Sequence, residues 1–220
     1  MQITETERRD RLITWLEDIY REVQQLLVNE HLFWELQKIV KENDNFKDAS
    51  GLFTRWIADG FKNSLMIAVR RQVKLDKQSI SLRGFLEEIK KFPELVSREH
   101  YMSLYAGKEK YVVQMGERSF DRVAGVGVNR IPVALVEQQI ADLSASAVKV
   151  EAYADRRVAH FDRRDPARPF PTFDDLTAAN KTMEKIVIRY WGLLKGGSLT
   201  ELMPTIIFDW QDVFKFPWKP

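Results

Sequence analysis

The chain has 220 residues, of which 45% are hydrophobic and 30% charged, with a formal net charge of +2. This length suits one well-buried domain or at most two small ones. The small net charge requires any affinity for nucleic acid to come from a local basic cluster. The absence of cysteine excludes disulfides and thiolate metal sites.

The N-terminal residues lack the basic-then-apolar pattern of a signal peptide. No apolar run approaches the roughly 18 residues that a membrane-spanning helix needs. We therefore expect a cytoplasmic protein with no membrane partner.

Apolar residues at helical spacing predict a first helix that starts at a cap formed by Thr4 or Thr6. Its pattern continues to Val40, and the turn-forming run Asn43-Asp44-Asn45 then stops it.

A second helix is predicted from Ser50-Gly51, and its centre is apolar nearly all round. That pattern predicts the most buried helix of the chain. Arg70 and Arg71 end it, either complementing the helix dipole or pairing with acids such as Asp76.

The middle of the chain is divided by proline and glycine. Ser79 or Ser81 is predicted to cap a short helix that Pro93 ends, and a further helix is expected over Glu94 to Tyr105. Four glycines lie between residues 106 and 130 and predict a loop with one short helix near Glu117–Val123.

The longest helical pattern begins at Pro132 and spans about thirty residues, on the order of 45 Å. Its apolar stripe consists of Val136, Ile140, Leu143, Ala147, Val150, Ala154 and Phe161.

Thr172 is predicted to cap a last long helix, which Gly196-Gly197 ends. Residues 199–220 form a strongly aromatic extension that we expect to pack on the bundle. Together these patterns predict an all-α fold, a single-domain helical bundle over residues 1–220 with two long helices near the centre.

Residues 153–164 combine a histidine with the densest arginine cluster of the chain. On a helix, Arg156 and Arg157 precede His160 by one turn, Arg163 and Arg164 follow it, and Tyr153 lies two turns before it. Neighbouring cations disfavour a second positive charge, so we expect His160 to be mostly neutral near pH 7. A neutral imidazole among guanidinium groups suits acid–base chemistry on a phosphodiester.

The same residues admit a structural interpretation. Asp155, Asp162 and Asp165 offset part of the positive charge, and charged runs on helices are usually solvated faces. The arginines and aspartates would then form a network within the helix, and the aromatic tail would carry the interactions of the molecule.

Asp155-Arg156-Arg157-Val158-Ala159-His160-Phe161-Asp162, late in a long helix and followed by another helix, resembles a motif of the higher eukaryote and prokaryote nucleotide-binding (HEPN) superfamily. The segment is most similar to the abortive-infection AbiU-like branch. Phe53-Thr54-Arg55-Trp56, Arg70-Arg71-Gln72 and Ser81-Leu82-Arg83 are also similar to that branch, as is the order of helices over most of the chain.

This resemblance implies a helical bundle that dimerises with its motif helices facing each other, and in active members metal-independent cleavage of RNA. It implies His160 as the acid or base and Arg156 as the residue that holds the scissile phosphate. Arg157, Arg163, Arg164 and Tyr153 would extend the RNA-binding surface. Members commonly act in phage defence or in toxin–antitoxin systems, so an antitoxin protein is an expected partner.

The chain departs from the motif at one point. The superfamily's motif has an arginine, then four to six intervening residues, then the histidine, and Asp155, Ala154 and Tyr153 occupy those arginine positions here. Either Arg156 substitutes for that arginine, or the protein is a non-catalytic helical dimer that binds nucleotide, nucleic acid or a protein. Three widely separated histidines and no paired-carboxylate motif predict no metal site and no cofactor.

Overall fold

The computed structural model describes residues 3–42, 51–159 and 170–215. Every regular element in these residues is a helix, and the only β-type pairing among them is one isolated bridge between Ser97 and Arg130. The predicted all-α class is therefore confirmed.

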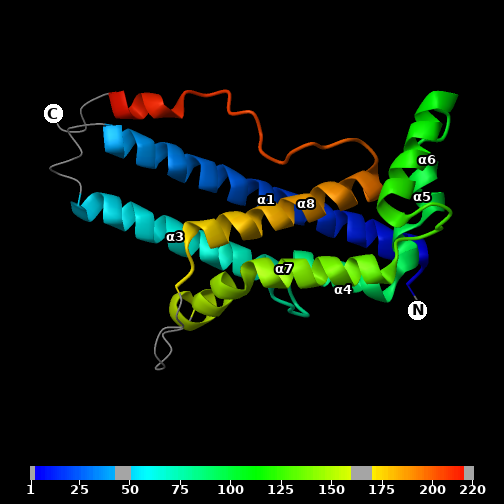
Figure 1. Ribbon diagram of the computed structural model, residues 1–220, viewed down its shortest axis with the longest axis horizontal. Helices are drawn as coiled ribbons and strands as arrows, with labels where there is room; N and C mark the ends of the chain where they lie inside the picture. The colour runs from blue at the N-terminus through cyan, green and yellow to red at the C-terminus, as the bar shows by residue number, and fades with distance from the viewer. Residues whose placement is uncertain (1–2, 43–50, 160–169, 216–220) are drawn as a thin grey trace.

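Four long helices run along the length of the molecule: α1 (Glu5–Glu42), α3 (Gly51–Val73), α7 (Val133–Tyr153) and α8 (Phe173–Lys195). In Figure 1, each runs antiparallel to its two neighbours. The helices α7 and α8 pack against each other, α8 against α1, α1 against α3, and α3 against α7. The bundle therefore contains four long helices, where the sequence predicted two near the centre.

Shorter elements complete one end of this bundle. The helix α4 (Leu82–Lys91) packs on α7 and α1. A 3-10 turn (Pro93–Val96) leads from it to α5 (Arg98–Ser103), which packs against α6 (Lys110–Ala124). Figure 1 shows α5 and α6 at the end of the bundle where α1 begins. A second 3-10 element (Trp210–Lys215) lies near the opposite end of α1.

The core lies between the four long helices and α4, and its fully buried side chains come from all five. They include Leu16 and Val23, Leu65 and Val69, Phe85 and Leu86, Leu143 and Ala147, and Val187 and Tyr190. At roughly 25 cal/mol per Å² of buried apolar surface, this interior is the main source of stability.

The predicted helix starts and stops are largely confirmed. Ser81 caps α4, accepting a hydrogen bond from the Gly84 N–H, and Thr172 forms a capping box with Asp175 at the start of α8. The helix α8 ends at Gly196, whose φ of +69° suits a residue without a Cβ. Predicted start and end of α1 also match its bounds of Glu5–Glu42.

The prediction that α3 is the most buried helix is wrong. Among its described side chains, the buried ones lie in its second half, from Leu65 to Val73, and Leu52 in its first turn is 84% exposed. Figure 1 shows the first turns of α3 extending past the ends of α7 and α8, so no long helix covers them on that side. The most extensively buried helix is α8, which has nine buried residues.

The region between α5 and α7 contains more helix than predicted. The expected segment near Glu117–Val123 is part of a longer helix, because α6 begins at Lys110. Gly116 is buried inside α6, and a Cβ at this position would lie 3.2 Å from ring atoms of Tyr105. This glycine therefore permits close packing within a helix instead of marking a turn.

The C-terminal extension touches the core at one buried residue, Leu202, whose backbone N–H donates to Glu184 at 2.9 Å. Beyond it, Ile207 and Phe208 are 78% and 77% exposed. The described part of the extension thus packs on the bundle only in part, and residues 216–220 lie outside the described ranges.

Candidate functional site

The segment singled out in the sequence begins where α7 changes its hydrogen-bond pattern. Residues Ala154–Val158 form a π-helical turn, and the Ala159 N–H donates to the Ala154 carbonyl at 2.8 Å. A π turn has more residues per turn than an α-helix, and single π turns are frequent at functional sites. The α-helical register assumed for the segment therefore does not hold over Ala154–Val158.

Asp155 projects from this turn to two cations, Arg70 in the last turn of α3 and Lys74 just after that helix ends. The Lys74 Nζ lies 2.8 Å and 3.0 Å from its two carboxylate oxygens, and the Arg70 Nε donates to the same carboxylate. All three side chains are partly buried, so the attraction is screened less than at an open surface. The carboxylate thereby fixes the end of α7 against α3.

Two opposing effects act on the pKa of the Asp155 carboxyl. Partial burial acts to raise it, but hydrogen bonds from Lys74 and Arg70 outweigh burial and hold the pKa below its ordinary value. Asp155 is therefore ionised at neutral pH, and its charge neutralises part of the surrounding positive charge.

Of the other predicted site residues, three lie in the described part of the chain and three lie outside it. Tyr153 packs its ring edge-on against Phe170, with centroids 5.7 Å apart. Arg156 and Arg157 lie in the π turn, both partly exposed. The predicted His160, Arg163 and Arg164 lie outside the described residues.

The structure corrects the acidic partner that the sequence suggested for Arg70 and Arg71 at the end of α3. Arg70 pairs with Asp155, and Arg71 pairs with Glu22 on α1 at 2.6 Å. Asp76, the partner considered from sequence, accepts a hydrogen bond from the Gln78 N–H instead. Both real partners are distant in sequence, so local spacing could not identify them.

Lys74 was missed by the sequence analysis. The available signal was its position four residues after Arg70, because residues i and i+4 share a helix face. We call Arg70 of α3, Lys74 just after the end of α3, and Arg156 and Arg157 of the π turn the basic cluster.

A polar groove of about 510 Å³ begins beside the π turn, at Val158, and follows the seam between α1 and α3. Amide and hydroxyl side chains line one part of it, namely Gln25, Asn29, Asn63 and Ser64, and Leu26, Ile67, Ala68 and Val158 give the rest an apolar surface. Arg71 and Glu22 also line the groove. Such neutral donors and acceptors suit the edges of nucleobases and ribose hydroxyls.

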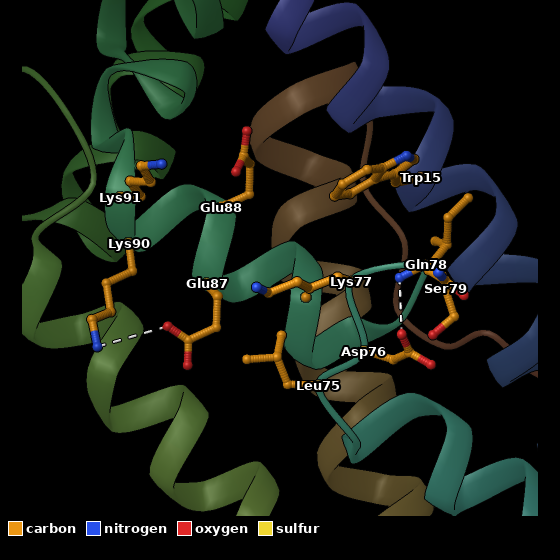
Figure 2. Close-up of a pocket in the computed structure, with 12 residues that line it drawn as sticks. Trp15, Leu75, Asp76, Lys77, Gln78, Ser79, Glu87, Glu88, Lys90 and Lys91 are labelled. Carbon is orange, nitrogen blue, oxygen red and sulfur yellow. Dashed lines mark hydrogen bonds and ion pairs between the residues drawn. The ribbon is translucent and has the colours of Figure 1, made fainter.

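A second, larger cleft of about 720 Å³ lies between α1, the α3–α4 loop and α4. Its lining includes Trp15 of α1, Lys77 of the loop, and Lys90 and Lys91 of α4, all of which Figure 2 labels. The sequence analysis assigned no role to these residues.

Among residues 3–42, 51–159 and 170–215, no group of three or more His, Asp or Glu side chains is arranged to hold a metal ion. No helix in the same ranges is both long enough and apolar enough to cross a bilayer. The protein is an all-α helical bundle, and its basic cluster lies where the end of α3 meets the π turn. Comparisons with protein-family models, curated proteins and solved structures found no match to the chain.

Proposed function

We propose that this protein binds RNA where α3 meets the π-helical turn and acts there as a metal-independent endoribonuclease. The observation that carries the proposal is the basic cluster, in which Arg70 of α3 and Lys74 just after it pair with Asp155, whose next two residues in the π turn are Arg156 and Arg157. Arginine and lysine groups are the usual ligands of RNA phosphates.

The cluster also bears on the arginine that the HEPN-like motif lacks before His160. Asp155 occupies one of the motif's arginine positions and forms ion pairs with Arg70 of α3 and with Lys74, which follows that helix. Arg70 and Lys74 thus bring positive charge to the position at which the motif has its arginine. Arg156 makes no ion pair with another described residue and can hold the scissile phosphate, while His160 transfers the proton.

A second function is favoured by the same contact. A carboxylate in place of an arginine lowers the local positive charge, which suits a non-catalytic helical dimer that binds RNA, nucleotide or a protein. Cleavage and binding must therefore be measured separately. In a toxin–antitoxin or phage-defence setting, the antitoxin would cover the basic cluster.

The test is incubation of the purified protein with single-stranded RNA in excess chelator, followed by analysis of fragments and, separately, of binding. We expect His160→Ala to abolish cleavage while retaining binding. The double variant Arg70→Gln/Lys74→Gln should weaken binding and reduce its dependence on salt. Arg70→Lys/Lys74→Arg preserves charge and should retain binding.

The control is Lys62→Gln, which removes a cation that pairs with Asp59 on the exposed part of the same helix. Circular dichroism of every variant establishes that the fold is intact. Binding without cleavage in wild type would select the non-catalytic function, and binding by neither wild type nor any variant would overturn both.

A further inference from the structure

The first half of α3 is packed on one face and exposed on the other. On the inner face, the Phe61 ring stacks on Phe33 of α1, with the ring centroids 4.8 Å apart. On the outer face, Leu52 and Trp56 are 84% and 70% exposed. At about 100° per residue, Leu52 points away from the side that Phe61 packs. We call this outer face the α3 crest, and its residues are Leu52, Arg55, Trp56, Asp59 and Gly60.

Gly60 has no role that the rest of the chain explains. It lies in the interior of α3, where a glycine is less favourable than an alanine. Its φ is not positive, and a Cβ at this position would meet no neighbouring side chain and no other element within 4 Å. A glycine on an exposed helix face instead leaves a flat spot, at which a second molecule can approach the backbone closely.

The α3 crest is complementary to itself when two copies pack antiparallel. Arg55 and Asp59 are four residues apart, so they lie along one side of the crest. Trp56 and Gly60 have the same spacing and lie along the other side. A two-fold axis perpendicular to two antiparallel helices brings the same side of each helix together. Trp56 then lies over Gly60 of the second copy, and Arg55 lies beside Asp59 of the second copy.

One register satisfies both of these pairs. The midpoint of residues 56 and 60 is residue 58, and the midpoint of residues 55 and 59 is residue 57. A two-fold axis between residues 57 and 58 therefore leaves each pair offset by about 1.5 Å along the helix, which is the rise of one residue. Because the axis repeats every contact, the dimer has two contacts of indole on glycine and two ion pairs.

Asp59 remains available for such an ion pair. Within one chain its carboxylate pairs with Lys62 at 2.8 Å, and a hydrogen bond from Lys62 holds the pKa of Asp59 below its ordinary value. Exposed pairs of this kind are weak, and an ionised carboxylate accepts hydrogen bonds at both oxygens. Arg55 of the second copy can therefore bind Asp59 while Lys62 stays in place.

We propose that the α3 crest is a homodimer interface, in which the α3 helices of two copies cross antiparallel near residue 58. This surface is separate from the HEPN-like segment that follows α7, and the inference does not depend on RNA binding. The face of one helix is smaller than the roughly 800 Å² per partner of a standard interface. We therefore expect a reversible dimer that forms at concentrations on the order of tens of micromolar. In dilute solution the protein is a monomer, and Asp59 and Lys62 remain suitable control positions there.

The experiment is sedimentation equilibrium of the full chain from about 1 µM to about 300 µM. Wild type should change from monomer to dimer over this range. Trp56→Gln should raise the dissociation constant about tenfold or more, because the indole is lost from the centre of the interface. Gly60→Gln should weaken the dimer by a similar factor. The same variant should raise the melting temperature of the dilute protein, because glutamine favours a helix more than glycine does.

Charge variants test the register. In Arg55→Asp the facing side chains are all acidic, and in Asp59→Arg they are all basic. Each variant should therefore dimerise about tenfold more weakly than wild type. The double variant Arg55→Asp/Asp59→Arg exchanges the two charges and should recover the affinity of wild type. A parallel pairing would give no such recovery, because each position would then face its own copy.

Tyr111→Gln is the matched control, since Tyr111 is 61% exposed on α6 at the opposite end of the bundle (Figure 1). It should dimerise as wild type does, and circular dichroism should show the same helical content in every variant. Wild type that stays monomeric throughout would leave the α3 crest to a different occupant and overturns the proposal. A dimer that Trp56→Gln and Gly60→Gln leave unchanged also overturns it, as does a double charge variant that fails to recover. RNA binding in dilute solution is measured separately, so the proposed function stands or fails independently of these outcomes.

Discussion

The ammonium group of Lys74, the residue that follows α3, lies within 3.0 Å of both carboxylate oxygens of Asp155, in the π turn that follows α7. The two residues are 81 positions apart in the sequence, and their contact attaches the end of α7 to α3. Asp155 therefore holds the end of α7 against α3 through ion pairs, and it also places a negative charge within the basic cluster.

Replacing Asp155 by Asn should have opposite effects on stability and on RNA binding. The variant loses the ion pairs with Lys74 and Arg70, and after discounting for solvent screening we expect a loss of about 1 kcal/mol, or about 2–4 °C in melting temperature. The released cations should strengthen salt-sensitive binding of RNA. Thermal melting and titration at two salt concentrations measure both effects, and Asp59→Asn, at an exposed pair on α3, is the control. An unchanged melting temperature would show that the ion pairs of Asp155 do not stabilise the fold.

The ion pairs of Asp155 should also make the stability of the fold depend on pH. Because the folded pKa of Asp155 lies below its ordinary value, the ionised carboxylate stabilises the fold. That contribution is fully present above the unfolded pKa of about 3.9 and is lost as pH falls through the lower folded pKa. The difference in melting temperature between wild type and Asp155→Asn should thus stay constant from about pH 7 to 5 and shrink below about pH 4. A difference that grows on acidification would contradict this assignment.

Thr172 should be important for the start of α8. Its hydroxyl accepts a hydrogen bond from the Asp175 N–H at 3.2 Å, and the Asp175 carboxylate accepts one from the Thr172 N–H at 2.8 Å. Thr172→Ala removes half of this capping box and should lower the free energy of unfolding by about 1 kcal/mol. Thr182→Ala is the control, since its hydroxyl bonds only to the Ala178 carbonyl within the helix. Equal denaturation midpoints for the two variants would refute a special role for the cap.

Tyr190 and Gln139 form a buried polar pair between α8 and α7. The phenol hydroxyl donates to the Gln139 side-chain oxygen at 2.6 Å, and burial raises the pKa of Tyr190. Tyr190→Phe leaves a buried amide without its partner and should cost about 1–3 kcal/mol. Tyr190→Phe/Gln139→Leu should recover much of that loss, because both polar groups are then gone. Urea denaturation of the single and double variants measures the coupling, and strictly additive losses would argue against a direct pair.

The parts of the fold that were predictable from sequence depend on local chemistry. Ser81 and Thr172 cap helices because their hydroxyls reach the nearest free N–H groups, and Gly196 ends α8 because its φ is positive. Such signals need only a few consecutive residues. The all-α class followed from them and from the apolar stripes.

The errors arose where distant residues determine the local structure. Gly116 was interpreted as a loop signal, yet Tyr105 packs directly on it within α6. The burial of α3 was overestimated because an apolar pattern does not reveal how far the neighbouring helices extend along it.

The candidate site shows the same limit. Arg156, Arg157 and Tyr153 were identified from their spacing, but the π turn and the contribution of α3 were not. The π turn coincides with the point where Arg70 and Lys74 hold Asp155, a contact that no local pattern encodes.

The π turn carries a consequence for the evolution of the chain. A single π turn corresponds to one residue more than an uninterrupted α-helix would contain. Removing one residue between Ala154 and Val158 would restore regular α-helical winding, and Ala159 would then turn by about 100° about the helix axis. A one-codon deletion at this position would thus exchange the π turn for an α-helical turn while leaving the length of every other described element unchanged.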